Sequence, residues 1–192
     1  MNIRRRALWA ATGLSMPVLM LASYLAWLQV SGNFAPVVEG AVYRSNQPTP
    51  ERLADNQASY GIKTVLNLRG AAPDEDWYAE EKRATEALGM TLVDVPLSST
   101  RELSDQELRQ LAEVLRTADK PILIHCRSGS NRTGLASAIY LAAIEEVGTD
   151  KAGQQLSLRY GHVAVPFRPE TSAMDRSWQR FRKLSVAPKE GE

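Results

Sequence analysis

The chain of 192 residues is poor in the side chains that form disulfides and metal sites. It has one cysteine, Cys126, and two histidines, His125 and His162. A single cysteine excludes an internal disulfide, and histidines this far apart lack the spacing of metal ligands. The formal net charge is only +1, so the composition gives no sign of a nucleic-acid-binding protein. We therefore expect no metal, no cofactor and no nucleic-acid partner, and the lone cysteine is the strongest candidate for chemistry.

Cys126 begins a loop that ends at Arg132, between an apolar strand and an apolar helix. Residues 122–124 follow Pro121 and are typical of a buried strand, and residues 135–144 predict a helix. In such a loop the backbone N–H groups can face one centre, and the helix N-terminus adds partial positive charge. The sequence therefore predicts an anion site in which the same field lowers the pKa of a thiol.

These residue types predict nucleophilic chemistry on a phosphate monoester. We expect Cys126 to attack phosphorus and form a cysteinyl-phosphate, while Arg132 clamps two phosphate oxygens with its planar guanidinium. Thr133 is expected to hydrogen-bond the sulfur, and His125 is expected to lie under the loop and fix the cysteine. The predicted phosphate-binding residues are Arg127, Ser128, Gly129, Ser130, Asn131 and Arg132.

The run His125–Gly134 resembles the signature of the cysteine-based protein tyrosine and dual-specificity phosphatase superfamily, His-Cys-x-x-Gly-x-x-Arg-Thr/Ser-Gly, and matches every fixed position. Val42–Pro48 resembles the Tyr-Arg-Ser-x-x-Pro motif of bacterial and atypical members. Gly61–Arg69 resembles their strand that ends in Asn-Leu-Arg, and Leu156–His162 corresponds to a helix after the loop. The resemblance covers about residues 40–165 and implies a cysteine-dependent phosphatase.

Two alternatives to this enzyme remain. A rhodanese-type sulfurtransferase also places a cysteine loop after a strand, and Cys126–Gly129 fits its Cys-Arg-x-Gly start. Arg132 comes one residue too late for that pattern and gives the loop the length suited to a tetrahedral phosphate. The other alternative is a module that binds phosphate without turnover. For His162 we expect a surface or capping role.

The phosphatase resemblance implies an aspartate that protonates the leaving group, on a loop upstream of the cysteine. The matching loop, Pro96–Glu102, contains no aspartate, and this absence is the feature that raises the non-catalytic alternative, against which the presence of Cys126 and Arg132 argues. Asp94 lies inside a predicted strand, and Asp105 opens a predicted helix that Ser104 caps. Neither position is that of a loop acid.

The acidic turn Asp74–Asp76 is the remaining source of a general acid. We expect Asp76 to be the acid, because it precedes Trp77 and Tyr78, aromatic residues able to anchor the turn near the Cys126–Arg132 loop (the phosphate loop). The alternative is that these acids only begin a helix, where negative charge is favourable.

The N-terminal segment predicts a membrane anchor. A basic cytoplasmic stub at 1–6, with arginines at 4–6, precedes an uncharged stretch. Residues 7–30 are long enough to cross a hydrocarbon core of ~30 Å as a signal anchor. The alternative is a cleaved signal peptide that ends near Leu21–Ser23. Either way we expect the catalytic domain outside the cytoplasm, in the periplasm if the source is Gram-negative. A single cysteine is compatible with that oxidising compartment, because it has no partner for a disulfide inside the chain.

After the anchor we expect a linker at 31–36, a phosphatase domain at 37–184 and a mobile tail at 185–192. Strands alternate with helices in the domain, which predicts an α/β fold with a mostly parallel central sheet flanked by helices, like that of dual-specificity phosphatases. The predicted strands lie near 42–43 and at 63–68, 91–95 and 122–125, and helices are predicted at 49–60, 76–88, 105–117, 149–159 and 170–184, besides the helix after the loop.

The expected partner is a phosphorylated substrate, either a protein or a lipid or glycolipid. Arg127, beside the cysteine, adds positive charge suited to a polyanion. A predicted anchor would also hold the active site near lipid headgroups. The sequence therefore favours lipid-linked phosphate over phosphotyrosine or phosphoserine on proteins, and it does not predict an oligomeric state.

Overall fold

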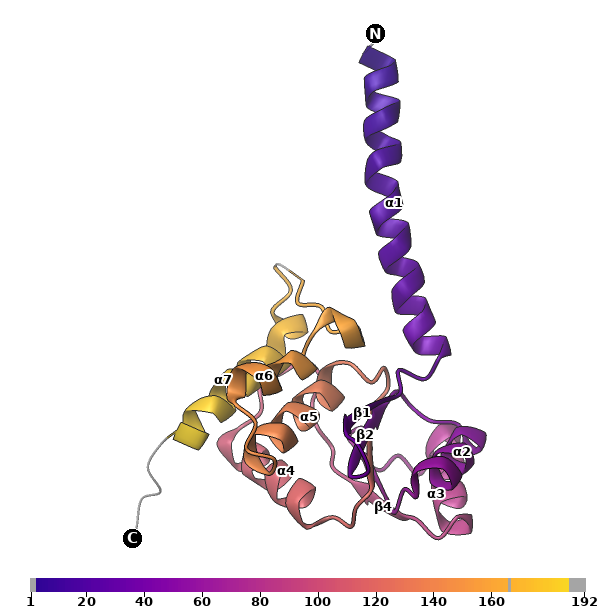
Figure 1. Ribbon diagram of the computed structural model, residues 1–192, viewed down its shortest axis with the longest axis vertical. Coiled ribbons are helices and arrows are strands. Elements are labelled where there is room, and N and C mark those ends of the chain that lie inside the picture. The colour runs from indigo at the N-terminus through magenta and orange to yellow at the C-terminus, as the bar shows by residue number, and fades with distance from the viewer. Residues whose placement is uncertain (1–2, 166, 187–192) are drawn as a thin grey trace.

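The computed structural model describes residues 3–165 and 167–186. A central sheet carries helices on both faces, and a long N-terminal helix, α1 (Ile3–Val30), projects from this domain (Figure 1). The predicted α/β class is confirmed, because the elements alternate along the chain as the sequence indicates.

The sheet has five strands in the order β1-β2-β5-β3-β4. The antiparallel pair is β1 with β2, and the pairs β2–β5, β5–β3 and β3–β4 are parallel, so the sheet is mixed. His125 pairs with Ser45 on one side and with Asn67 on the other, so three strands end at the same edge. The loop after β5 therefore leaves the sheet between the loops after β2 and β3, where parallel sheets place ligands. The strands are β1 (Ala35–Val38), β2 (Val42–Ser45), β3 (Thr64–Asn67), β4 (Thr91–Asp94) and β5 (Ile122–His125).

Helices cover both faces of this sheet, and side chains alternate between the two resulting cores. Leu66 and Ile124 face the core under α4, α5 and α7, whereas Val65 and Leu123 face the core under α2 and α3. This double coverage explains why β5 is apolar along nearly all of its length. The helices are α2 (Pro50–Tyr60), α3 (Asp76–Ala87), α4 (Asp105–Thr117), α5 (Asn131–Ala143), α6 (Thr149–Ala152) and α7 (Ala173–Val186), with short 3₁₀ turns η1 (Gly153–Gln155), η2 (Leu158–Tyr160) and η3 (Pro169–Ser172).

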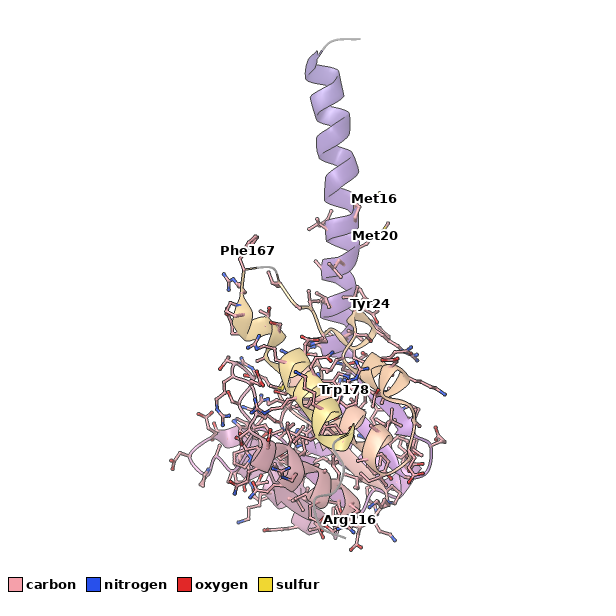
Figure 2. All side chains as sticks on the ribbon, turned by 90° about the vertical axis from the view of Figure 1, so that its left-hand side faces the viewer. Met16, Met20, Tyr24, Arg116, Phe167 and Trp178 are labelled. Carbon is pink, nitrogen blue, oxygen red and sulfur yellow. The ribbon has the colours of Figure 1, made fainter. Side chains whose placement is uncertain are left out.

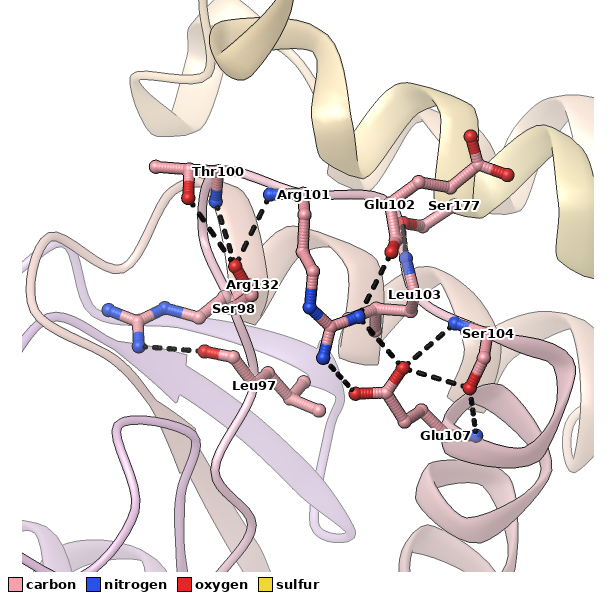
Figure 3. A network of polar contacts seen from close by, with 10 residues as sticks. All are labelled: Leu97, Ser98, Thr100, Arg101, Glu102, Leu103, Ser104, Glu107, Arg132 and Ser177. Atoms are coloured by element: carbon pink, nitrogen blue, oxygen red, sulfur yellow. Dashed lines mark hydrogen bonds and ion pairs between the residues drawn. The ribbon is translucent and has the colours of Figure 1, made fainter.

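The predicted starts of α2 and α4 are confirmed by their caps. The Thr49 hydroxyl accepts the N–H of Arg52 ahead of Pro50. The Ser104 hydroxyl accepts the N–H of Glu107, whose carboxylate accepts the backbone N–H of Ser104 in return (Figure 3). These reciprocal bonds satisfy donors that a helix N-terminus leaves free.

Several predicted boundaries differ from the structure, among them the helix predicted at 170–184, which is divided between η3 and α7. The predicted linker at 31–36 runs into β1, which begins at Ala35, because the antiparallel hairpin with β2 extends the sheet by one edge strand. The helix predicted at 149–159 is divided into α6, η1 and η2. The predicted tail at 185–192 begins inside α7, and its residues 187–192 lie outside the described residues.

The helix predicted at 7–30 is present within α1, and residues 3–6 of the predicted basic stub belong to it as well. Among residues 3–165 and 167–186, however, no helix is long and apolar enough to cross a membrane. The transmembrane assignment of 7–30 is therefore not supported. Met16 and Met20 lie on the exposed part of α1, away from the sheet (Figure 2), whereas Leu28 near its C-terminal end is 5% exposed.

Candidate active site

The loop between β5 and α5 is held tightly on two sides. Gly129 has a φ of +71°, and a Cβ atom there would lie 2.6 Å from the carbonyl oxygen of Ser45. Gly134, in the first turn of α5, would bring a Cβ atom within 2.8 Å of the carbonyl oxygen of Gln155. Only glycine permits both approaches. The end of β2 and the turn η1 thus fix the shape of the loop.

Cys126 follows β5 directly, and its side chain is buried. Burial by itself raises the pKa of this thiol. The Thr133 hydroxyl, the charge of Arg132 and the backbone N–H groups of Thr133 and Gly129 act in the opposite direction, and the net pKa of Cys126 is lowered from its ordinary value. Thr133 is itself buried, with no other hydrogen-bond partner for its hydroxyl in the described chain. The site therefore favours a thiolate, the nucleophilic form of cysteine.

Arg132, at the start of α5, is held by the loops after β3 and β4. Its Nη1 atom donates to the carbonyl oxygen of Leu68 at 3.1 Å. The same atom donates to the carbonyl oxygen of Leu97 at 3.3 Å (Figure 3). Nε and Nη2 of Arg132 make no hydrogen bond to the described residues. A guanidinium fixed along one edge keeps its other N–H groups free for a bidentate anion.

Arg44 is buried and stabilises the loop. The Tyr-Arg-Ser motif includes this residue, but the sequence predicted no role for it. Its Nη2 atom donates to the carbonyl oxygen of Gly129 at 2.7 Å, and its Nη1 atom donates to the carbonyl and side-chain oxygens of Gln155. Its guanidinium lies 3.8 Å from the ring centre of Tyr160. Burial lowers the pKa of Arg44 to about 10, still high enough for a full charge at neutral pH. Arg44 thus joins β2, the loop and η1.

His125 lies directly before the nucleophile and pairs with a carboxylate that the sequence analysis missed. Its Nε2 atom lies 2.9 Å from Oε1 of Glu81, and both side chains are fully buried. Glu81 Oε1 also accepts the Nε2 amide of Gln47 at 3.0 Å. A signal was available in α3, because Glu81 shares its buried face with Tyr78 and Thr85 at helical spacing.

The expected surface or capping role of His162 is wrong. His162 is 6% exposed, its Nδ1 atom lies 2.9 Å from Oδ1 of Asn131, and its Nε2 atom lies 3.0 Å from the carboxylate of Asp175. It therefore joins the start of α5 to α7.

Ser128 and Ser130 stabilise the loop between β5 and α5 through a hydrogen bond of 2.7 Å between their hydroxyls.

Asp76 is the exposed first residue of α3. The aromatic residues after it are anchored: the Trp77 ring lies under the guanidinium of Arg69 at 3.3 Å, and the Tyr78 hydroxyl donates to Asp94. Among the residues that the structure describes, no hydrogen bond or ion pair joins the Asp76 carboxylate to the phosphate loop. Asp94 ends β4 and also accepts the side-chain amide of Asn67 at 2.7 Å.

The Pro96–Glu102 loop offers no free acid to the site. The Ser98 hydroxyl accepts the N–H groups of Thr100 and Arg101 and so stabilises the loop (Figure 3). The carboxylate of Glu102 is bound by Arg180 of α7 at 2.7 Å. This loop supplies the carbonyl of Leu97 that orients Arg132, rather than a proton donor.

The fold and the cysteine loop together are those of the cysteine-based phosphatases of the dual-specificity class. Residues 29–165 match the family described as DSP-PTPase phosphatase fused to NAD+ kinase, and the chain belongs to this family. The family match begins within α1, upstream of the predicted domain start at residue 37.

Two curated proteins are similar to the chain. It is 33% identical to inositol diphosphatase SIW14 of Saccharomyces cerevisiae over 107 residues, which cover 53% of this chain and 36% of the relative. It is 27% identical to dual specificity protein phosphatase TpbA of Pseudomonas aeruginosa over 124 residues, which cover 62% of this chain and 50% of the relative. The chain thus spans about a third to a half of the curated relatives it matches.

Solved structures of the same two relatives share the fold. The crystal structure of P. aeruginosa TpbA has a TM-score of 0.60 at 23% identity and covers 82% of this chain and 92% of its own. The catalytic domain of S. cerevisiae SIW14, solved with citrate, has a TM-score of 0.58 at 23% identity and covers 81% and 94%. At this identity the likeness establishes the fold, and the site rests on the residues themselves.

Proposed function

We propose that the chain hydrolyses phosphate monoesters through a cysteinyl-phosphate intermediate. The observation that carries the proposal is the thiol of Cys126, whose pKa is lowered although it is buried. It stands in a loop whose arginine is oriented by two carbonyl groups. A lowered thiol pKa beside a fixed guanidinium is suited to attack on a bound phosphate dianion.

In the first step the Cys126 thiolate forms a bond to phosphorus as the bond to the leaving oxygen breaks. Arg132 and the backbone N–H groups of the loop stabilise the charge on the equatorial oxygens. In the second step water attacks phosphorus, the S–P bond breaks, and phosphate and thiolate are released. The Thr133 hydroxyl stabilises the departing sulfur, while His125 and Arg44 position the loop.

We propose Asp76 as the acid that protonates the leaving oxygen, since Trp77 anchors the turn beside Arg69 and the carboxylates of Asp94 and Glu102 are already bound by other side chains. The test is the pH profile of Asp76→Asn on a substrate with a poor leaving group, with Asp74→Asn as the matched control. Loss of turnover in Asp76→Asn alone is expected. Equal profiles for both variants and the parent would exclude Asp76.

For the substrate we propose a compact phosphorylated lipid or glycolipid headgroup in preference to a phosphoprotein. Arg127 is exposed beside the cysteine and has no carboxylate within 4 Å in the described chain, so it suits a polyanion. Among the relatives, SIW14 is named an inositol diphosphatase, and TpbA has been solved with phosphotyrosine. Comparing a phosphorylated lipid in micelles with a phosphotyrosine peptide tests the choice, and a clear preference for the peptide would overturn it.

We also propose that the domain acts outside the cytoplasm. The support is in the sequence, where arginines at 4–6 precede an uncharged stretch from Ala7 to Gly32. Protease added to spheroplasts of a Gram-negative host should digest the expressed chain, as it digests a periplasmic control. Protection of the chain until the cells are lysed would refute the location.

Turnover of an aryl phosphate by the full chain is the decisive experiment. We expect hydrolysis that Cys126→Ser abolishes and that Arg132→Lys reduces strongly, because lysine cannot grip two oxygens. Arg116→Lys is the matched control, since Arg116 lies on α4, far from α1 (Figure 2), in an exposed pair with Glu113. Phosphate binding without turnover would favour the binding module. Thiosulfate cleavage without phosphatase activity would favour the sulfurtransferase.

A further inference from the structure

His162 is a buried histidine to which the proposed chemistry gives no role. It lies between η2 and η3, where α5 and α7 pack against each other (Figure 1). Its side chain is 4% exposed, so its ring nitrogens need hydrogen-bond partners within the protein. The preceding residue, Gly161, faces α1, because a Cβ atom there would lie 3.4 Å from Leu28 and 3.6 Å from Leu25. Apolar side chains of α1 therefore border this region, and the polar partners of the ring come from α5 and α7.

Both ring nitrogens of His162 face oxygen atoms. Nε2 lies 3.0 Å from each carboxylate oxygen of Asp175 on α7, and Nδ1 lies 2.9 Å from Oδ1 of Asn131. An ionised carboxylate and an amide oxygen only accept hydrogen bonds, so each nitrogen must donate one. A neutral imidazole has a single N–H group, whereas an imidazolium has two. The two contacts together thus require the charged ring, with Asp175 as its counter-ion.

Asn131 joins this ring to the phosphate loop. It is the residue before Arg132 and the first residue of α5. The first backbone hydrogen bond at this end of α5 runs from the N–H of Gly134 to the carbonyl of Ser130, and the N–H groups of Asn131 and Arg132 make no hydrogen bond to the described residues. Free N–H groups at a helix N-terminus are the donors that bind a phosphate. His162 therefore holds the residue that carries the first of these donors.

The start of α5 lacks the kind of cap that fixes α2 and α4. Ser130 stands at the N-cap position but makes no capping hydrogen bond, and its hydroxyl bonds that of Ser128 instead. A capping side chain would occupy N–H groups that an anion needs. A hydrogen bond to the side chain of Asn131 fixes the same helix start and leaves these N–H groups free.

We propose that His162 is a positioning residue of the phosphate loop. As an imidazolium held by Asp175, it fixes Asn131 and thereby directs the free N–H groups at the start of α5 toward the bound phosphate. This inference rests on the proposed function and adds to it a residue that lies outside the loop. Its effect passes through the side-chain amide of Asn131, which distinguishes it from a contact that only holds α5 against α7.

The first test is a double-mutant cycle on the affinity for inorganic phosphate, measured by calorimetry on the full chain with Cys126→Ser. His162→Met keeps an unbranched side chain without N–H donors and should weaken binding about tenfold, as for one lost hydrogen bond to a charged group. Asn131→Ala should weaken it similarly, and His162→Met added to Asn131→Ala should cause no further loss. The same loss from His162→Met with and without Asn131→Ala would show that His162 only packs α5 against α7 and would overturn the proposal. Unchanged binding in His162→Met would overturn it as well.

The second test uses Asp175→Asn, which removes the counter-ion of the ring at a side chain that is 39% exposed and so keeps the proposal testable if His162→Met does not fold. The chain has two histidines, so its imidazole nitrogens are readily assigned by NMR. At the pH of the binding measurement both nitrogens of His162 should carry hydrogen, and Asp175→Asn should yield a neutral ring and weaker phosphate binding. Asp150→Asn is the matched control, because it breaks an exposed pair with Arg182 of α7. An unprotonated Nδ1 in the parent, or equal phosphate affinities of Asp175→Asn and Asp150→Asn, would overturn the proposal.

These measurements separate this inference from the proposed function, because phosphate binding in Cys126→Ser requires no turnover. A parent chain without turnover whose variants still show the expected coupling would overturn only the proposed function. A parent chain that hydrolyses aryl phosphate but whose variants show no coupling would overturn only the role of His162.

Discussion

Replacing Gly129 with alanine should break the phosphate loop more than it breaks the fold. The left-handed conformation at φ +71° costs a non-glycine residue about 1–2 kcal/mol. A new Cβ atom would also lie 2.6 Å from the carbonyl oxygen of Ser45 and 2.7 Å from the backbone N of Asn46, and such overpacking typically costs about 1–3 kcal/mol. The two effects together predict a loss of about 2–5 kcal/mol.

Gly40→Ala is the matched control for this experiment. Gly40 has nearly the same conformation, with φ +76°, but nothing lies within 4 Å of its missing Cβ atom. It should therefore lose only the conformational part, about 1–2 kcal/mol. At about 2–4 °C per kcal/mol for a chain of this size, the melting temperature of Gly129→Ala should fall by about 4–20 °C. That of Gly40→Ala should fall by about 2–8 °C.

The functional readout is phosphate binding and aryl phosphatase activity below the melting temperature. Relief of the contact with β2 requires the loop to move, and a moved loop no longer directs its N–H groups at one centre. We expect activity to fall strongly in Gly129→Ala and to stay intact in Gly40→Ala. Equal destabilisation of the two variants, or full activity of Gly129→Ala, would refute the claim that close contact with β2 fixes the loop.

Three further predictions concern ionisable groups. Thr133→Val should raise the pKa of Cys126, seen as a shift of the iodoacetamide alkylation profile to higher pH, and an unmoved profile would contradict the bond to sulfur. Arg44→Met should lower both stability and activity, because it leaves buried carbonyls unpaired at about 1–3 kcal/mol each, and denaturant unfolding measures this loss. The pKa of Glu107 is held at about 2, mainly by Arg101, so its contribution is complete above the unfolded pKa and is lost as the pH falls toward 2. Glu107→Gln should therefore flatten the acid limb of a stability–pH curve, and an unchanged limb would contradict this assignment.

The phosphate loop was predictable because its signals are local. A buried strand, a glycine that permits φ above zero, and an apolar helix are all written within residues 121–144. The cap of α4 was predictable for the same reason, since Ser104 and Glu107 stand at fixed spacing. Strand β1 was missed because it is short, contains Pro36 and exists only through its pairing with β2.

The supports of the loop were not predictable, because they depend on tertiary contacts between distant residues. Glu81 and Asp175 look like ordinary acids of amphipathic helices, and only the packing of α3 and α7 brings them to His125 and His162. Arg44 is likewise held in its buried position by a hydrogen bond to the carbonyl oxygen of Gln155 in η1. The sequence pattern predicted η1 as part of one continuous helix. A buried charged side chain needs polar partners, and only the tertiary structure brings those partners together, so a local sequence pattern does not predict it.

The phosphate loop is partly held by residues that precede the predicted domain. The side-chain amides of Gln29 and Asn33 donate to the carbonyl oxygen of Ser128, at 3.3 and 3.1 Å, and that of Asn33 also reaches the carbonyl of Tyr160 at 3.0 Å. A protein shortened to begin at residue 37 would lose these donors and half of the β1 strand. Poor activity of such a fragment would reflect the loss of these hydrogen bonds to the phosphate loop rather than an inactive enzyme. The smallest fragment worth purifying therefore begins within the last turns of α1.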